Sequence, residues 1–196
     1  MIRQWLLWWW AKKNVPAEFS FPQALRDAKR VLLLMPSSVE ALREVEVFLS
    51  RLPKVFPRAE VTLLYPPKSM IARFYKPYGF TTIVPGRGDV GLFGMPSSKI
   101  MGALTEKRFD VLISLNRQPS VFFAAISISS KAPVRLGLPD GMGEPFINVE
   151  LRHGRENADI KTEFILFVDM LRKLAAVPAG PEESEPGRMA QPRLPL

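Results

Sequence analysis

Short apolar runs alternate with segments of helical periodicity through the middle of this chain. Val31 to Met35 are five consecutive apolar residues, which is typical of a strand buried on both faces. Residues 39–52 then carry apolar side chains at a nearly helical spacing. The same alternation predicts further strands over residues 60–65, 80–84, 109–115, 134–138 and 146–151. It predicts helices over residues 22–30, 69–78, 96–107 and 159–176, and one more between the strands at 109–115 and 134–138.

Strands that alternate with helices favour a parallel sheet, because parallel neighbours need a crossover connection. The expected fold is therefore α/β, with a single Rossmann-like parallel sheet over residues 22–177 and helices on both faces. Ligands of such sheets bind beyond the carboxyl ends of the strands, where the strand order reverses. The loops at residues 36–40, 116–120 and 139–143 are the candidates for a site.

The two ends of the chain differ in composition from the middle. All four tryptophans lie in residues 1–14, at Trp5, Trp8, Trp9 and Trp10, and Lys12 and Lys13 follow them. Tryptophan beside lysine favours the interface of an anionic membrane, so an apolar helix that anchors the chain there is one expectation. A helix that packs its tryptophans on the domain is the second expectation, and an unstructured end is the third. Residues 178–196 are rich in Pro, Gly and Glu, which predicts a disordered tail.

The amino-acid composition limits the kinds of partner, metal site and cofactor that the chain can have. The chain has a net charge of +8, which favours anionic partners: an anionic lipid surface, a glycan or a nucleotide sugar. It has no cysteine and one histidine, so a thiolate or histidine-rich metal site is excluded and no cofactor is expected. The aromatic residues do not interleave with a basic stripe, so no nucleic-acid partner is expected.

Four stretches carry a family resemblance: VLLLMPSS at residues 31–38, LPKVFPRAEVTLLYP at 52–66, FDVLISLN at 109–116 and APVRLGLPD at 132–140. In this order and spacing they resemble the N-terminal, acceptor-side domain of glycosyltransferase family 9, the heptosyltransferase-type enzymes of lipopolysaccharide synthesis. The resemblance implies a second, C-terminal domain that binds the nucleotide sugar. We expect this 196-residue chain to lack that donor-binding domain.

The resemblance also points to site residues. The family follows its first strand with a serine-rich turn and then Gly-Asp, where the aspartate is a candidate general base. Here Ser37 and Ser38 form the turn, and Glu40 and Ala41 stand at the Gly and Asp positions. Glu40 is therefore the catalytic candidate. The ligand-binding candidates are Ser37, Ser38, Asn116, Arg117 and Asp140, which all fall in the predicted loops.

Two functions fit these observations. The favoured hypothesis is a non-catalytic binding or interaction domain, cytoplasmic and peripheral on the inner face of the cytoplasmic membrane. The alternative is an active glycosyltransferase that moves a hexosyl or heptosyl group from a nucleotide sugar to an envelope glycan. In that case Glu40 would act as the base and a partner chain would supply the donor site, since a transferase holds both substrates in one cleft.

Overall fold

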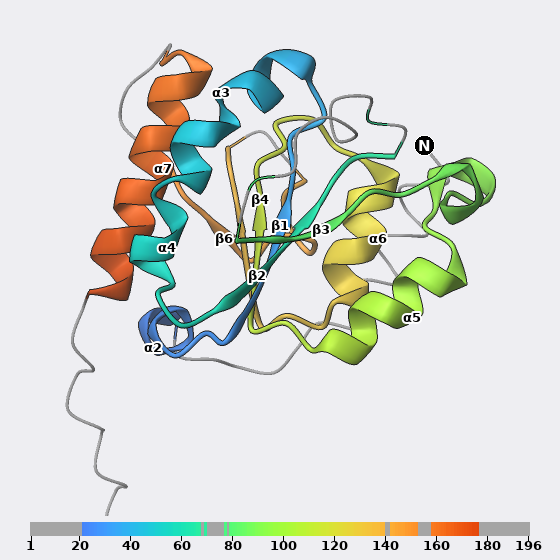
Figure 1. Ribbon diagram of the computed structural model, residues 1–196, viewed down its shortest axis with the longest axis horizontal. Coiled ribbons are helices and arrows are strands. Elements are labelled where there is room, and N and C mark those ends of the chain that lie inside the picture. Colours follow the sequence, from blue (N-terminus) through green and yellow to red (C-terminus); the bar gives the residue numbers. More distant parts are fainter. Residues whose placement is uncertain are drawn as a thin grey trace, which may run out of the picture.

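Six parallel strands form one sheet in the computed structural model, which describes residues 21–67, 69, 77, 79–139, 142–152 and 158–176 (Figure 1). The strands lie in the order β3-β2-β1-β4-β5-β6. They are β1 (Arg30–Leu34), β2 (Glu60–Leu64), β3 (Thr81–Ile83), β4 (Val111–Ser114), β5 (Val134–Gly137) and β6 (Val149–Glu150). Every neighbouring pair is parallel, as the alternation of apolar runs and helices predicted.

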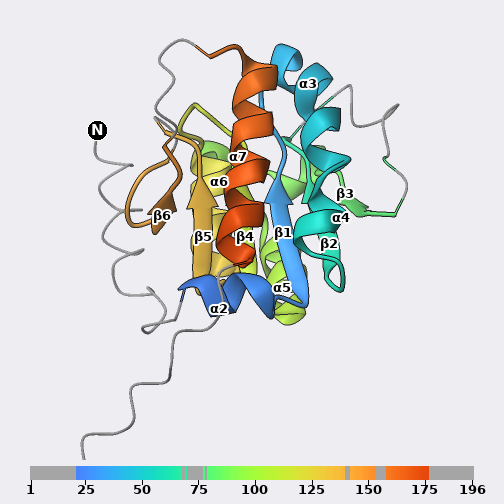
Figure 2. The same ribbon diagram turned by 90° about the vertical axis from the view of Figure 1, so that its left-hand side faces the viewer.

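Helices cover both faces of the sheet, which confirms the predicted layers. On one face lie α3 (Val39–Leu49), α4 (Leu52–Val55) and α7 (Ile160–Ala175), and on the other α5 (Ser98–Lys107) and α6 (Val121–Ser129) (Figure 1). The short helix α2 (Phe21–Arg26) lies across the amino ends of the strands (Figure 2). Two 3-10 turns, η2 (Arg87–Asp89) and η3 (Leu92–Gly94), join β3 to α5.

The central strand β1 supplies core residues to both faces. Val31 and Leu33 belong to the cluster beneath α3 and α7, and Leu32 and Leu34 belong to the cluster beneath α5 and α6. All four are fully buried, and each buried side chain of this size contributes about 1.5–3 kcal/mol through the hydrophobic effect. A continuous apolar run is therefore what this strand needs, because both of its faces are covered.

Side-chain caps begin four of the helices. Ser38, Ser97, Ser120 and Asp159 each accept a hydrogen bond from the backbone N–H three residues further on. The backbone N–H and then the hydroxyl of Thr162 hold the pKa of Asp159 below its usual range. The cap therefore stabilises α7 at neutral pH, and this contribution is lost as the pH falls through the lowered pKa.

Three predicted elements differ from the structure. The helix expected over residues 22–30 ends at Arg26, and Arg30 already belongs to β1. The helix expected over residues 39–52 is divided into α3 and α4, because Pro53 suits the first turn of a new helix rather than the interior of an old one. The strand expected over residues 146–151 is reduced to β6. The carbonyl of Phe146 is bound by the side chains of Ser127 and Arg135, and this holds Phe146 in a turn.

Several predictions fall on residues outside the described ranges. These are the tryptophan-rich segment, the tail at residues 178–196 and most of the helix expected over residues 69–78. Among the described helices, none is both long and apolar enough to cross a bilayer.

Candidate functional site

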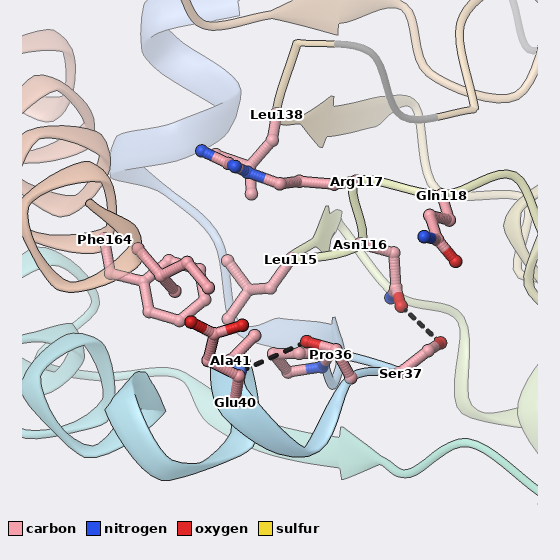
Figure 3. A pocket seen from close by; sticks show the side chains of 12 residues that line it. Pro36, Ser37, Glu40, Ala41, Leu115, Asn116, Arg117, Gln118, Leu138 and Phe164 are labelled. Carbon is pink, nitrogen blue, oxygen red and sulfur yellow. Dashed lines mark hydrogen bonds between the residues drawn. The ribbon is translucent and has the colours of Figure 1, made fainter. Parts of the chain in front are cut away.

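A hollow of about 240 Å³ opens at the carboxyl ends of β1 and β4 (Figure 3). The chain order reverses between these two strands, because β1 is followed by β2 on one side and has β4 on the other. Parallel α/β sheets bind ligands at such a point, since the two connections leave in opposite directions and part from one another. The turn after β1, the loop after β4, the end of β5 and the start of α7 line the hollow.

Asn116 joins the two loops that form the hollow. Its side-chain Nδ2 donates to the carbonyl of Met35 at 3.0 Å and lies 3.4 Å from that of Leu34. Its Oδ1 accepts from the hydroxyl of Ser37 at 2.6 Å, as the dashed line in Figure 3 shows. Asn116 is 3% exposed, so these bonds lie away from water and fix the distance between the loops.

The turn after β1 presents two serines and a carboxylate to the hollow. Ser38 caps α3 by accepting from the N–H of Ala41 at 3.1 Å. Glu40 lies in the first turn of α3, is exposed and lines the hollow. A carboxylate in this position is favoured by the dipole of the helix. Ala41 stands where the resembling family has its aspartate, and its buried methyl group also lines the hollow.

Arg117 reaches the hollow from the opposite side. Its Nη2 lies 2.6 Å and its Nε 2.8 Å from Oε2 of Glu163, a residue of α7. The side chain of Glu163 is 5% exposed, whereas that of Arg117 is 50% exposed. The buried carboxylate therefore holds the guanidinium at the hollow, while half of the Arg117 side-chain surface stays open to solvent or ligand.

The remaining wall is apolar. Leu115, Leu138, Ile160 and Phe164 line it, and Phe164 projects from α7 beside Leu115 (Figure 3). A hollow with hydroxyl, amide, carboxylate and guanidinium groups on one part of its surface and aliphatic and aromatic groups on another suits a ligand with both kinds of surface. Sugar rings are of this kind, because their C–H faces are apolar and their rims carry hydroxyls.

The structure brings five of the six predicted binding and catalytic residues to this hollow. They are Ser37, Ser38, Glu40, Asn116 and Arg117. Asp140 lies outside the described residues, as do the predicted membrane-contacting Trp5, Trp8, Trp9, Trp10, Lys12 and Lys13. No group of histidine, cysteine and carboxylate side chains within the described ranges could hold a metal ion.

Sequence reasoning missed the contribution of α7. Glu163 holds Arg117, and Phe164 and Ile160 form part of the wall. One signal was present in the sequence: Glu163 interrupts the apolar face of an amphipathic helix, beside Phe164 and one turn before Phe167. A carboxylate on an apolar face needs a partner, and here that partner is Arg117.

Replacing Glu163 by glutamine is expected to lower the free energy of unfolding by about 1–2 kcal/mol, measured by urea denaturation. The amide preserves shape and one acceptor but removes the charge that pairs with Arg117. The matched control is D169N, because Asp169 pairs with Arg51 at 3.4 Å where both side chains are about one-third exposed. That control should cost less than about 1 kcal/mol. Equal losses in the two variants would show that burial of Glu163 adds nothing to the pair.

Solved glycosyltransferase structures resemble this fold. The glycosyl transferase family 9 protein of Veillonella parvula DSM 2008 matches 79% of this chain with a TM-score of 0.56 at 17% sequence identity. The E. coli heptosyltransferase WaaC with ADP matches 75% with a TM-score of 0.50 at 16% identity. The match takes up 43% and 46% of those chains, so this chain spans less than half of their length.

Comparison by sequence adds no relative: no family model matches the chain, and no curated protein does. The likeness therefore rests on the path of the backbone. The expected resemblance is confirmed at the level of architecture: this chain has the Rossmann-like fold found in part of glycosyltransferase family 9 structures.

Proposed function

We propose that this chain is a glycosyltransferase-like domain that binds an anionic sugar, such as a sugar phosphate or an acidic glycan, without transferring it. The hollow between β1 and β4 is the binding site, and the domain works at a membrane surface. The observation that carries the proposal is that Arg117 and the hydrogen-bonded pair Ser37 and Asn116 line one hollow at the switch point of the sheet.

The chemistry of the hollow supports an anionic sugar. Arg117 offers a guanidinium on a side chain that is half exposed, and guanidinium groups bind phosphate and carboxylate through paired N–H donors. Ser37, Ser38 and Gln118 add hydroxyl and amide groups of the kind that bind sugar hydroxyls. Phe164 and Leu138 add apolar surface for the face of a ring.

The turn after β1 favours binding over transfer. Ala41 stands at the position where the resembling family has a candidate base, and a methyl group cannot accept a proton. The ion pair with Glu163 also occupies part of the Arg117 guanidinium.

The membrane role rests on the sequence. The four tryptophans and two lysines in the first fourteen residues are of the type that lies at a membrane interface. A net charge of +8 favours an anionic surface.

A second candidate function follows from the position of Glu40. Its carboxylate lines the same hollow as Arg117, so it could remove a proton from a sugar hydroxyl bound there. The chain would then be an active glycosyltransferase, with the nucleotide-sugar site on a partner chain or on further residues.

Calorimetric titration with glucose 1-phosphate tests the proposed function. Wild-type protein should bind it more tightly than it binds glucose, and R117A should weaken binding by about tenfold or more, since a hydrogen bond to a charged group contributes about 1.5–3 kcal/mol. The control is R43A, because Arg43 is an exposed residue of α3 that does not line the hollow. Equal affinity in wild type and R117A would contradict the proposed site.

Nucleotide-sugar consumption separates the two functions. The non-catalytic proposal expects wild type and E40A to release nucleotide from a nucleotide sugar at the same background rate, with or without an acceptor glycan. A rate that depends on acceptor and falls in E40A would overturn it in favour of the transferase.

A further inference from the structure

Four neighbouring strands each have basic residues at their amino ends, at the first residue of the strand or within four residues before it. Parallel strands begin at the same side of a sheet, so these residues gather there. Together they form what we call the basic edge: Lys29 and Arg30 at β1, Arg58 before β2, Lys107 and Arg108 before β4, and Lys131 before β5. All except Lys107 are exposed.

The strand register places the first residues of these strands at nearly the same height in the sheet. Arg30 at the start of β1 pairs with Glu60 at the start of β2, and Val31 pairs with Val111 at the start of β4. Val111 in turn pairs with Val134, which begins β5. Four strands therefore start within about one residue of the same height. The basic residues at or before these strand starts therefore begin from similar heights along the sheet.

Charge is divided between the two ends of the sheet. Residues 142–148 lie near the amino end of β5, because Pro145 accepts from Arg135 and Asn148 donates to Pro133. Around the amino ends, residues 26–30, 54–60, 106–110, 131 and 142–148 therefore hold eight cations and five carboxylates, a net charge of +3. Around the carboxyl ends, the described residues 36–44, 85–99, 116–120, 149–152 and 158–163 hold six cations and six carboxylates, a net charge of zero. The positive potential of the described domain is thus concentrated on the side opposite the hollow.

Backbone conformation gives a second, independent observation. Arg108 ends α5 with a φ of 47° and Lys131 follows α6 with a φ of 54°. This left-handed conformation is where helices usually place glycine or asparagine, because a larger side chain is strained there. Two cations occupy such positions on one edge. The helix ends at Arg108 and Lys131 would form equally well without a positive charge. Attraction to an anionic partner would explain why both positions carry one.

Part of the basic edge is held by contacts within the protein. Arg30 Nη1 donates to the carbonyl of Lys107 at 2.6 Å, and Lys107 Nζ lies 3.6 Å from the carboxylate of Glu60. Asp110 accepts from the backbone N–H groups of Lys29 and Arg30 at 2.8 and 2.9 Å. These bonds fix the ends of β1 and β4 together, so the exposed cations project from a rigid base.

We infer that the basic edge is the surface through which this domain lies on an anionic lipid bilayer. The inference rests on the proposed membrane role and names the face that carries it. A bilayer is flat and presents many phosphates, so several cations at similar heights on one edge can each lie near a phosphate at the same time. Single-stranded nucleic acid is disfavoured, because it binds in grooves where aromatic side chains stack on bases, and the basic edge contributes only Lys and Arg.

Chain direction agrees with this orientation. Phe21 begins α2, which lies across the same amino ends of the strands (Figure 2). Phe21, the first residue that the structure describes, therefore lies on this side, and the predicted membrane-contacting tryptophans precede it in the sequence. The hollow opens at the other ends of the strands. A five-residue strand spans about 16 Å, so a ligand in the hollow would lie at least that far from the lipid headgroups.

Vesicle co-sedimentation of the full chain tests the inference. The vesicles contain phosphatidylcholine alone or with about one-third phosphatidylglycerol, and binding is expected only to the latter and to weaken as salt is raised. The double variant R108N/K131N should bind the anionic vesicles about thirtyfold more weakly, since each basic residue near such a surface contributes about fivefold. Its melting temperature should stay the same or rise, because asparagine tolerates the left-handed conformation.

The control removes the same amount of charge elsewhere. R43Q/K99Q changes two exposed cations on α3 and α5 near the carboxyl ends of the strands, and its vesicle binding should stay within about threefold of wild type. Equal losses in the two double variants would overturn the inference, because net charge alone would then explain binding. Tighter binding of a short single-stranded RNA than of vesicles, lost in R108N/K131N, would overturn it in favour of nucleic acid.

Two further experiments distinguish a failure of this inference from a failure of the proposed function. The variant W8S/W9S/W10S should weaken vesicle binding but leave the effect of R108N/K131N in place. If the tryptophan variant abolishes binding and the edge variant has no effect, the basic edge is refuted while the membrane role survives. R108N/K131N should bind glucose 1-phosphate as wild type does, and failure of that sugar phosphate to bind wild type would refute the hollow alone.

Discussion

Replacing Arg135 by methionine is expected to lower the free energy of unfolding by about 3–5 kcal/mol. Arg135 lies in the buried strand β5 and is 1% exposed. Its guanidinium donates to three backbone carbonyls: Ala132 at 3.0 Å, Phe146 at 3.1 Å and Pro145 at 3.2 Å. Methionine fills a similar volume but donates nothing, so these carbonyls would lose the donor that compensates for their burial.

Burial disfavours the charged form of this guanidinium, because desolvation lowers the pKa of Arg135. The charge is nevertheless retained, and its contacts explain why. Residues 145 and 146 belong to the turn that precedes β6, and Arg135 binds the carbonyls of both. The side chain therefore ties a connection to the sheet where only two residues of strand pair with β5.

Urea denaturation of R135M measures the effect, and R51M is its control. Arg51 pairs with Asp169 at 3.4 Å with its side chain 39% exposed, so its replacement should cost less than about 1 kcal/mol. R135K should also be destabilised, because an ammonium group cannot reach three carbonyls with the geometry of a guanidinium fork. A loss below about 1 kcal/mol in R135M would show that the three carbonyls find other donors.

The change N116D is expected to lower the free energy of unfolding by about 2–3 kcal/mol at pH 7 and to abolish ligand binding in the hollow. The substitution preserves shape but replaces a donating amide by a carboxylate. Nδ2 of Asn116 now donates to the carbonyl of Met35 at 3.0 Å. A carboxylate in its place would face carbonyl oxygens, and like partial charges repel.

The effect of N116D should depend on pH in a definite direction. Burial beside carbonyls raises the pKa of the introduced carboxyl above its value in the unfolded chain. The folded variant therefore binds a proton more tightly than the unfolded variant does, and its stability falls as the pH rises above the unfolded-state pKa. Relative to wild type, the deficit should shrink on acidification, because the protonated carboxyl can donate one hydrogen bond. A deficit that is constant between pH 4 and pH 7, roughly the range in which a modestly raised carboxyl titrates, would contradict this.

The comparison variant is N148D, because Asn148 also donates to a carbonyl, that of Pro133 at 2.7 Å. It should be destabilised similarly, but it lies between β5 and β6 and does not line the hollow. N148D should therefore keep its affinity for glucose 1-phosphate at a temperature where both variants are folded. Loss of affinity in both variants would mean that general loosening of the fold explains the effect of N116D.

The sheet and its layers could be predicted because their signals are local. A strand buried on both faces must be apolar throughout, and Val31 to Met35 are. A serine or aspartate before an amphipathic segment caps it, as Ser38 and Asp159 do. The position of the hollow could be predicted in the same way, because parallel strands bring the loops after β1 and β4 to one end of the sheet.

The features that sequence reasoning missed depend on contacts between distant residues. Arg135 is a charged residue inside a predicted strand, and it is buried because Pro145 and Phe146 fold over it. The short length of β6 has the same cause. The bond between Arg117 and Glu163 joins residues 46 apart in the chain, and only the packing of α7 against the sheet brings them together.

The most direct test of the account is an NMR titration of the isotope-labelled full chain with glucose 1-phosphate. We expect the backbone amide signals of Ser37, Asn116 and Arg117 to shift together with one dissociation constant. The signals of Arg58, Arg108 and Lys131, at the opposite end of the sheet, should not move. Saturating shifts confined to residues outside the hollow, or no saturating shift at all, would contradict the claim that this switch-point hollow is a sugar-phosphate site.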